Sequence, residues 1–259
     1  MTQDVFPRVL STGVHLEVLD HTESTNRQLT DHPGPPDVWS VVITDNQTSG
    51  RGRAGRRWTT LPGRGLAVSI QLPESLIPSP LHHGWLGWLS LIVGTALADA
   101  MASVGVSHVS VKWPNDVHID GKKVAGILGE ITPDNRVVVG MGVNLFYDVN
   151  ELPTPESTSL SRHHILPPDV ADQLVAGVLE TLMRVMPRIT STVPDDIRQW
   201  VDSRLGTINK TVRVTTPAGD TIVGVATGLA DDGALRVQPD GSHTEVAVSV
   251  GDIEHLRHE

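Results

Sequence analysis

The sequence predicts an α+β protein: a body with a mixed, largely antiparallel sheet and flanking helices, followed by a small all-β barrel. In the body, segments that alternate apolar and polar residues are separated by turn signals, and a long segment with helical periodicity lies among them. After Gly206 the alternating stretches become short and are broken by turns rich in Asp and Gly, which is typical of a small barrel. We therefore expect two domains, at residues 1–206 and 207–259.

Alternation with period two predicts the strands of the body. They are expected at residues 14–18, 38–44, 66–72 and 109–113. Asp120-Gly121 lies between two apolar-bearing segments and predicts a tight hairpin. A second hairpin is expected to turn at residues 133–135 and to lead into residues 137–142.

Apolar residues at helical spacing predict helices over 85–104, 170–186 and 197–205. A short helix is also expected near Thr25, because Thr25 and Gln28 have the spacing of a capping box. Residues 147–168 are rich in Pro, Ser, Thr and acidic residues, and they predict a long surface loop.

The composition restricts the classes of function. The 259 residues carry a formal charge of −10, which argues against a protein that coats nucleic acid. The absence of cysteine excludes disulfides and thiolate chemistry. No apolar run is expected to approach the roughly 20 residues of a membrane helix. Because the N-terminus also lacks a signal-like segment, a cytoplasmic protein without a membrane partner is expected.

Cationic residues gather in two short windows of this acidic chain. Five of the sixteen arginines lie between Arg51 and Arg64, and three of the four lysines lie between Lys112 and Lys123. Like charges this close together repel one another unless an anion lies among them. An anionic ligand is the simplest explanation for their clustering.

The first window, Gly50-Arg-Gly-Arg-Ala-Gly-Arg-Arg-Trp58, predicts a loop that closes over a phosphate-bearing ligand. Its three glycines disfavour helix and strand and let backbone amides approach a ligand closely. Arginine binds phosphate through paired hydrogen bonds, and Trp58 offers a face on which a base can stack. The alternatives are a solvated basic loop and an RNA-binding arginine–glycine segment.

The second window ends a predicted strand with Lys112-Trp-Pro-Asn-Asp116. Pro114 interrupts the hydrogen-bond ladder, so Asn115 and Asp116 project from a turn. Lys123 begins the return strand and is expected to lie near them across the hairpin. A cation, a carboxylate and an amide on a rigid hairpin suggest a site, and an ordinary charged hairpin is the alternative.

Other motifs indicate less on their own. Gly140-Met-Gly-Val-Asn144 ends a strand with small residues, where a ligand or another segment can come close. The twelve histidines include two adjacent pairs, but no His-Glu-x-x-His spacing occurs, so no protein metal site is expected. A P-loop motif does not occur either, so a phosphate would be bound in another way.

Five of these motifs, in this order, resemble those of the biotin–protein ligase family. They are Ser24-Thr-Asn26, the segment Gln47–Trp58, Lys112–Asp116, Lys123-x-Ala-Gly-Ile-Leu128 and Gly140-x-Gly-x-Asn144. Residues 224–237 and 251–257 are similar to the C-terminal β domain of that family. The resemblance implies a body with the fold shared by biotin–lipoate ligases and class II aminoacyl-tRNA synthetases, and it makes residues 1–206 the catalytic biotin- and ATP-binding domain.

The resemblance also implies an enzyme with two half-reactions. Biotin and ATP first give biotinyl-5′-AMP and pyrophosphate, with Mg²⁺ bridging the phosphates of ATP rather than held in a protein cage. A lysine of the partner, a biotin carboxyl carrier domain, then attacks the adenylate and releases AMP. A lid that becomes ordered over the adenylate excludes water, so residues 50–58 and part of 147–160 are expected to be poorly ordered without ligand.

Residue roles follow from the same resemblance. The biotin-binding residues are expected to be Ser24, Thr25, Asn26, Gln47, Arg51, Gly52, Arg53 and Lys123. The residues that bind ATP or the adenylate are expected to be Arg51, Arg53, Arg56, Trp58, Asn115, Asn144 and Arg257. The catalytic residues are Lys123, Arg53 and Asp116, of which Lys123 meets the biotin carboxylate and the α-phosphate, and Asp116 orients or deprotonates the incoming lysine.

The sequence departs from the family at two places. Some members carry an N-terminal winged helix that binds DNA, but the first strand here is predicted at Val14, so a monofunctional enzyme without DNA binding is expected. After Trp58, Thr59-Thr-Leu-Pro-Gly63 replaces the more usual Ser-Pro-x-Gly. A homodimer is an alternative to a monomer, since some relatives dimerise through a sheet edge.

Two other functions are alternatives to biotin ligation. A lipoate–protein ligase or octanoyl transferase has a similar body and also acylates a carrier lysine, but the arginine–glycine segment and the β module favour biotin. A non-catalytic biotin sensor or RNA-binding module would use the same segment without catalysis.

Overall fold

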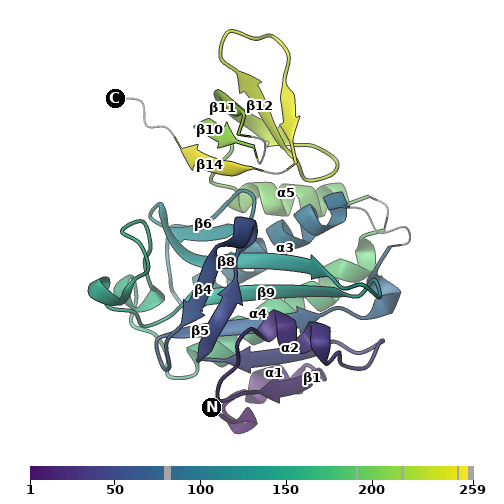
Figure 1. Ribbon diagram of the computed structural model, residues 1–259, viewed down its shortest axis with the longest axis vertical. Helices are drawn as coiled ribbons and strands as arrows, with labels where there is room; N and C mark the ends of the chain where they lie inside the picture. The colour runs from purple at the N-terminus through teal and green to yellow at the C-terminus, as the bar shows by residue number, and fades with distance from the viewer. Residues whose placement is uncertain (79–82, 191, 217–218, 250, 256–259) are drawn as a thin grey trace.

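A computed structural model describes residues 1–78, 83–190, 192–216, 219–249 and 251–255 (Figure 1). The body is built on a seven-stranded sheet in the order β1-β2-β5-β9-β8-β7-β6. Its strands are β1 (His15–Val18), β2 (Ser40–Thr44), β5 (Gly65–Gln71), β6 (Val109–Lys112), β7 (Asp116–Ile119), β8 (Lys122–Ile131) and β9 (Val137–Asn144). Only β1 and β2 are parallel neighbours in this sheet. The predicted mixed, largely antiparallel sheet is confirmed.

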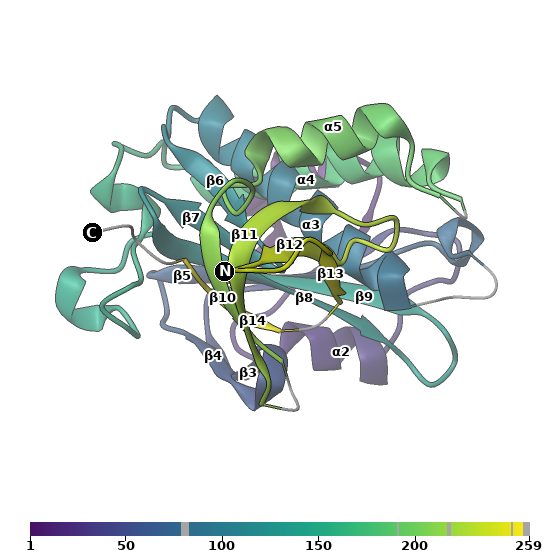
Figure 2. The same cartoon turned by 90° about the horizontal axis from the view of Figure 1, so that it is seen from above.

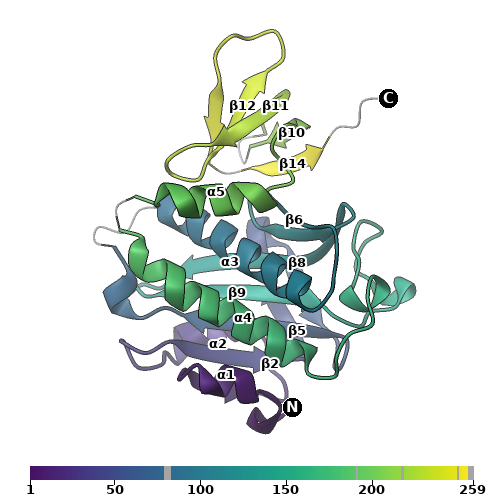
Figure 3. The ribbon, with the colours of Figure 1, turned by 180° about the vertical axis from the view of Figure 1, so that it is seen from behind.

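Helices cover the two faces of the sheet unequally. The long helices α3 (His83–Ser103) and α4 (Val170–Val185) cover one face, and α5 (Asp195–Arg204) packs on α3 near β6 (Figure 3). The short helix α2 (Thr25–Asp31) contacts β2, β5 and β9 from the other face. The hairpin of β3 (Gln47–Arg51) and β4 (Arg57–Thr60) lies on the same side as α2 (Figure 1). The second face is therefore only partly covered.

Strand β5 shows why the two faces differ. Leu66, Val68 and Ile70 are buried in the main hydrophobic core. Because successive side chains of a strand alternate between faces, Ala67 and Ser69 face the opposite side. There Ser69 Oγ donates to Thr25 Oγ1 of α2 at 2.7 Å. One face of the sheet thus forms the core, and the other carries small and polar residues.

The start of α2 differs from the prediction. Ser24, rather than Thr25, is the N-cap residue, and its hydroxyl accepts the backbone N–H of Arg27 at 3.4 Å. The Thr25 hydroxyl lies instead between Ser69 Oγ and Gln47 Oε1, so it serves tertiary packing. The capping residue Ser24 and the site residue Thr25 are neighbours, and the spacing of the motif alone does not show which of them caps the helix.

The prediction of a loop over residues 50–58 is wrong for both ends of the segment, because they belong to the two-stranded ribbon of β3 and β4. Gly50 pairs with Trp58, and Arg51 pairs with Arg57. Only Arg53–Gly55 forms a separate 3-10 turn at the tip. A side chain at Gly50 would collide with the Gln47 amide, so the glycine permits the close packing of the ribbon. The segment is a hairpin with a tight tip.

The remaining elements of the body follow the predictions closely. Both predicted hairpins are present, with Asp120, Gly121 and Asn135 at positive φ in their turns. Residues 147–168 form a long connection that contains only two 3-10 turns. The other helices are α1 (Pro7–Ser11) and the 3-10 turns Gln3–Val5, Glu74–Leu76, Val149–Glu151, Leu160–Arg162 and Met186–Arg188.

Helix α3 corrects one expectation from the composition. Its segment Gly84–Ser103 is 20 residues long and is apolar enough to meet the length and composition criteria for a membrane span. Most of this segment is buried inside the protein, where it packs against α4, β6 and β8. A buried core helix meets the same criteria. It is the one such helix in the part of the chain that the structure describes.

The C-terminal module is a five-stranded antiparallel sheet in the order β13-β12-β11-β10-β14. Its strands are β10 (Thr211–Thr215), β11 (Thr221–Leu229), β12 (Leu235–Pro239), β13 (Val246–Val248) and β14 (Asp252–His255). Within the described residues, β13 and β14 are edge strands that do not pair with each other. The predicted all-β character is confirmed, but the predicted closure into a barrel is wrong for this part of the chain. The buried residues of the sheet belong to the same hydrophobic cluster as the body, so packing rather than closure covers them.

The C-terminal sheet lies beside β6 and α5 of the body (Figures 1 and 2). Two tryptophans of the body attach it there. The Trp88 indole N–H donates to the Asp231 carbonyl at 2.9 Å, and the Trp113 indole N–H donates to the Gly233 carbonyl at 2.9 Å. Arg198 pairs with Asp231 at 3.1 Å and lies 5.2 Å from the ring centroid of Trp88. The turn 231–233 is therefore fixed to α3, α5 and the segment after β6.

We predict that Asp172→Ala destabilises the body. The buried Asp172 carboxylate accepts the backbone N–H groups of Arg8 and Val9, each at 3.0 Å, and so attaches α1 to α4. Its removal leaves buried donors without a partner, which should lower the free energy of unfolding by about 2 kcal/mol or more. Urea denaturation measures this. Asp169→Ala, which removes an exposed partner of Arg8, is the control and should have the smaller effect, and equal effects would contradict the argument.

Candidate active site

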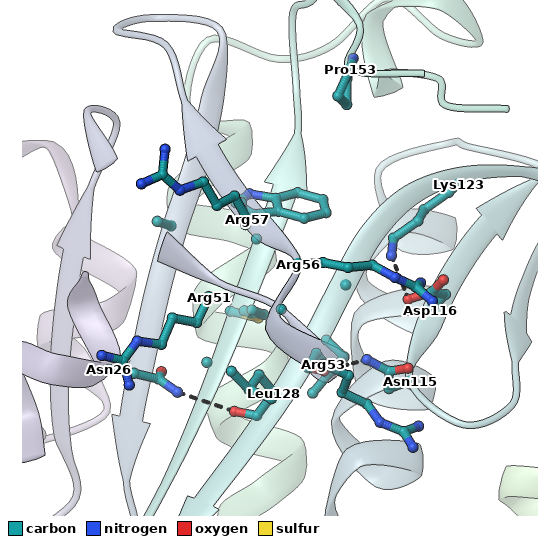
Figure 4. Close-up of a pocket in the computed structure, with 18 of the residues that line it drawn as sticks. Asn26, Arg51, Arg53, Arg56, Arg57, Asn115, Asp116, Lys123, Leu128 and Pro153 are labelled. Carbon is teal, nitrogen blue, oxygen red and sulfur yellow. Dashed lines mark hydrogen bonds and ion pairs between the residues drawn. The ribbon is translucent and has the colours of Figure 1, made fainter. Parts of the chain in front are cut away.

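A cavity of about 370 Å³ lies on the partly covered face of the body sheet (Figure 4). Its floor is the middle of β5, β8 and β9, and its walls are α2, the β3–β4 hairpin and the turn after β6. Every motif singled out in the sequence contributes to its lining, which includes Ser24, Thr25, Asn26, Gln47, Arg51, Gly52, Arg53, Arg56, Trp58, Asn115, Asp116 and Lys123. The fold therefore brings residues about 100 positions apart into one site.

The lining is strongly cationic although the chain is acidic. The cationic side chains are Arg51, Arg53, Arg56, Arg57, Lys112 and Lys123. Asp116 is the only acidic residue among the described residues that line the cavity. Six positive groups against one negative group produce a positive potential that attracts an anion. The clustering seen in the sequence thus becomes a cluster in space.

A polar network at the α2 end holds Thr25 and Gln47 in place. The Gln47 side-chain oxygen accepts the Thr25 backbone N–H at 2.9 Å, and the Gln47 amide donates to the Trp58 carbonyl at 3.3 Å. Ser69 Oγ lies 2.7 Å from Thr25 Oγ1 and 2.5 Å from Asn26 Oδ1. All of these side chains are buried, so their orientations are fixed by their partners rather than by solvent.

Asn26 reaches across the sheet from α2. Its amide donates to the Leu128 carbonyl at 3.3 Å (Figure 4). It also donates to a carboxylate oxygen of Glu130 at 2.6 Å. A side chain at Gly140 would collide with the Asn26 side chain. The small residue predicted to permit a close approach therefore makes room for Asn26.

Trp58 lies against a glycine pair on adjacent strands. Gly126 of β8 and Gly142 of β9 face each other in the register of the sheet. A Cβ at Gly142 would collide with the Trp58 indole nitrogen, and one at Gly126 would lie 3.3 Å from the indole ring. The two glycines thus leave a flat surface on the sheet, and the Trp58 indole of the hairpin packs on it.

Lys123 and Asp116 form the charged centre of the site. Their Nζ and Oδ1 atoms are 2.7 Å apart, as the dashed line in Figure 4 marks. The Lys123 ammonium also lies 5.6 Å from the Trp58 ring centroid, a cation–π distance. The predicted approach of Lys123 to Asp116 across the hairpin is confirmed.

The long connection after β9 fixes the backbone of Lys123. The Lys123 N–H donates to the Glu156 carbonyl at 2.8 Å, and the Thr158 N–H donates to the Lys123 carbonyl at 2.8 Å. The same connection places Pro153, Thr154 and Ser157 in the cavity lining. Sequence reasoning predicted the connection but did not assign these residues to the site.

Asn115 and Asn144 are both engaged by protein groups. The Asn115 amide donates to the Ile127 carbonyl at 2.7 Å, and the Ile127 N–H donates to the Asn115 carbonyl at 2.8 Å. Asn144 does not line the cavity; it is buried, and its amide donates to the Thr158 carbonyl at 3.0 Å. Asn144 thus supports the connection that holds Lys123. Arg257 lies outside the described residues.

Sequence reasoning missed Ser69 and Glu130, which hold Asn26, and Ile253 of β14, which lines the cavity. Ser69 left a signal, since it is a hydroxyl in the middle of an apolar strand with alternating pattern. Ile253 left none, because its place depends on how the C-terminal sheet packs on the body.

Comparison with known proteins shows the family of the chain. Residues 18–145 match the Biotin/lipoate A/B protein ligase family, and residues 207–256 match the Biotin protein ligase C terminal domain. The chain is 35% identical over 247 residues to a biotin--[acetyl-CoA-carboxylase] ligase of Mycobacterium tuberculosis, covering 93% of this chain and 89% of that protein. It is 30% identical over 243 residues to the bifunctional ligase/repressor BirA of Bacillus subtilis, covering 87% and 70%.

The chain belongs to the biotin protein ligase family. Solved structures of biotin ligases have a fold similar to that of this family member. Biotin protein ligase from Aquifex aeolicus in complex with biotin and ATP aligns with a TM-score of 0.77 at 23% identity, covering 93% of this chain and 99% of that one. A biotin acetyl coenzyme A carboxylase synthetase from Helicobacter pylori aligns with a TM-score of 0.63 at 18% identity, covering 90% and 99%.

For this biotin protein ligase family member, we predict that Gly142→Ala loosens the hairpin. The new methyl group would occupy the position of the Trp58 indole, so the hairpin must move off the floor. The free energy of hairpin opening should fall by about 1–3 kcal/mol. Hydrogen exchange of the β3 and β4 amides measures it. Gly228→Ala is the control, because nothing lies within 4 Å of a Cβ there, and unchanged exchange in Gly142→Ala would contradict the packing argument.

Proposed function

We propose that this protein is an ATP-dependent biotin–protein ligase. It forms biotinyl-5′-AMP from biotin and ATP and then transfers biotin to a lysine of a biotin carboxyl carrier domain. The observation that carries the proposal is a cavity with two chemically different ends, a buried neutral polar network beside α2 and a cluster of arginine and lysine side chains beside the hairpin. Biotin and ATP together have this division into a neutral ring and a polyphosphate.

The neutral end suits the ureido ring of biotin. Thr25, Asn26 and Gln47 offer hydroxyl and amide groups, and Ser24 and Gly52 also line the cavity. A site that hydrogen-bonds a ligand N–H or carbonyl discriminates strongly against an analogue that lacks it, because the polar groups of the site would stay unpaired. This end therefore favours biotin over the lipoyl and octanoyl groups, which have no ureido ring.

The cationic end suits the phosphates. Arg51, Arg53 and Arg56 come from the hairpin, and Lys112 and Lys123 come from the body sheet. In adenylation, the biotin carboxylate attacks the α-phosphorus of ATP and pyrophosphate leaves, so negative charge grows on the phosphate oxygens. Cations fixed beside those oxygens stabilise the transition state more than the ground state. Trp58, one residue pair from the tip of the hairpin, offers a ring face to the adenine.

The Lys123–Asp116 ion pair links the two half-reactions. Without substrate, the carboxylate balances the ammonium group at 2.7 Å. When Lys123 turns to the biotin carboxylate and the α-phosphate, Asp116 loses that partner and can accept a hydrogen bond or a proton from the carrier lysine. The lysine nitrogen must lose a proton as it attacks the acyl carbon and AMP leaves. Asp116 is the only acidic residue of the described lining that is positioned for this role.

The site can accommodate Mg²⁺ that is bound to ATP. Within the described residues, no group of three or more His, Asp or Glu side chains gathers that could hold the ion. Asp116 is the single carboxylate of the described lining, and Lys123 pairs with it. Mg²⁺ held by ATP phosphates and water needs few protein ligands, and it neutralises charge on the leaving pyrophosphate.

Further parts of the proposal concern the whole chain. We place the catalytic domain at residues 1–206 and the C-terminal domain at 207–259, which the family match from residue 207 supports. The hairpin would close over the adenylate, with Arg257 near the nucleotide. The expected contact of Asn144 with the nucleotide is not carried into the proposal, because Asn144 does not line the cavity. Cytoplasmic location, absence of DNA binding and the choice between monomer and homodimer stay predictions.

A labelling assay tests the proposed function. The protein is incubated with radiolabelled biotin, ATP, magnesium and a biotin carrier domain, and in parallel with lipoate or octanoate and a lipoyl carrier domain. We expect transfer of biotin alone, since only biotin has the ureido ring that the neutral end can bind. Labelling by lipoate without biotin would overturn the assignment, and no transfer of either would leave the non-catalytic alternative.

We predict that Lys123→Ala strongly impairs the first half-reaction. Loss of its charge beside the α-phosphate should lower biotin-dependent exchange of pyrophosphate into ATP by about 100-fold or more. Lys122→Ala, a change of the neighbouring exposed lysine, is the matched control and should stay within about twofold. Arg53→Ala should also lower the exchange. Undiminished exchange in both Lys123→Ala and Arg53→Ala would refute the site assignment.

A further inference from the structure

A second cavity, of about 730 Å³, lies where the edge of the body sheet meets the C-terminal sheet. Its ionisable lining residues are Lys112, His118, Lys210 and His255, and none of its described lining residues is acidic. We call it the junction cavity. Nothing in the proposed ligase reaction uses His118, Lys210 or His255.

The sheet register explains how these basic groups meet. On strands β6 and β7, His118 pairs with Ser110, and Asp116 pairs with Lys112. Because the two pairs are two residues apart along each strand, their side chains lie on the same face of the sheet. His255 is the last residue of β14, and Lys210 directly precedes β10. Two sheets from different parts of the chain thus contribute to one basic surface. Lys112 lines both this cavity and the active-site cavity.

His118 has an unused hydrogen-bonding atom in this cavity. Its Nδ1 lies 3.0 Å from the Gly121 carbonyl oxygen, which can only accept, so Nδ1 carries the proton. In the neutral ring Nε2 then has only a lone pair, and this atom is buried without a hydrogen-bond partner. Protonation would convert Nε2 into a donor that needs an acceptor.

Positive groups surround both imidazoles. Burial lowers the pKa of His118, Lys112 and Lys123 lower it further, and the Gly121 carbonyl and Asp116 act in the opposite direction. Burial, together with Lys112, His118 and Lys210, lowers the pKa of His255 to about 4. The Thr207 hydroxyl lies 3.3 Å from His255 Nε2. An anion among these groups would relieve their mutual repulsion.

We propose that the junction cavity binds a phosphate oxyanion between Lys112, Lys210 and the two imidazoles. The lysines supply charge, and the protonated Nε2 of His118 supplies a directed N–H donor, a combination that suits tetrahedral oxyanions. The anion can be inorganic phosphate from solution or pyrophosphate that passes Lys112 from the active-site cavity. Only the second source rests on the proposed ligase function.

The proposal has a definite pH dependence. Both imidazoles are neutral near pH 7 without the anion, because their pKa values are lowered. A bound oxyanion favours their charged forms and raises both pKa values. Binding therefore takes up protons, and the affinity for the phosphate monoanion rises as the pH falls below 6.5 and approaches the pKa of His255, about 4.

Imidazole NMR on the whole protein tests the site. The His118 and His255 signals are assigned with His118→Gln and His255→Gln, and their pKa values are measured with inorganic phosphate, with pyrophosphate and with neither. We expect both pKa values to rise by about one unit or more on saturation. Pyrophosphate that binds about tenfold tighter than phosphate would identify the reaction product as the source, and equal affinities would identify free phosphate.

Three charge-removing variants distinguish this cavity from the active-site cavity. Lys210→Ala, which alters an exposed residue outside the proposed catalytic site, should weaken the effect on the imidazoles about tenfold, while Lys122→Ala stays within about twofold. Arg56→Ala, in the active-site cavity, should leave the imidazole response unchanged. The proposal is overturned if neither anion shifts the imidazole pKa values, or if the shift depends on Arg56 and not on Lys210. Both results can be obtained whether or not the protein ligates biotin.

Discussion

The site depends on one steric constraint: the absence of side chains at Gly126, Gly140 and Gly142 on the floor of the cavity. Gly140 admits Asn26 from α2, and Gly126 with Gly142 admits the indole of Trp58 from the hairpin. A Cβ at Gly140 or Gly142 would push these elements away from the sheet. This displacement would also move the hydrogen-bond network of Thr25 and Gln47 and the arginines that follow β3. The floor therefore sets the distance between the polar and the cationic end of the cavity.

The positions of the charged side chains depend on backbone segments outside the cavity. Lys123 faces Asp116 because the hairpin turns at Asp120 and Gly121, both at positive φ. The connection after β9 then holds the Lys123 backbone through Glu156 and Thr158. On the other side, Trp113 lines the cavity and donates its indole N–H to Gly233 of the C-terminal sheet. The position of the C-terminal sheet is thus coupled to the turn that carries Asn115 and Asp116.

Much of the fold and the site could be predicted, because the relevant signals are local. Period-two alternation located β1, β2, β5 and β6, and turn residues located both hairpins. The predictions failed where a local pattern competes with tertiary partners. Thr25 has capping spacing but is held by Ser69 and Gln47, so Ser24 caps α2. Gly50 and Arg51 read as loop, yet pairing with Trp58 and Arg57 makes them strand.

The sequence by itself determined the fold class, the family and the clustering of positive charge, since motifs and composition need no coordinates. Only the tertiary structure decided which residues meet. It separated Asn144, which supports a loop, from Asn26, which reaches into the cavity, although both are single asparagines in family motifs. It also brought His118 and His255 to one cavity. Contacts between residues over 100 positions apart depend on how sheets pack, and sequence spacing does not record that packing.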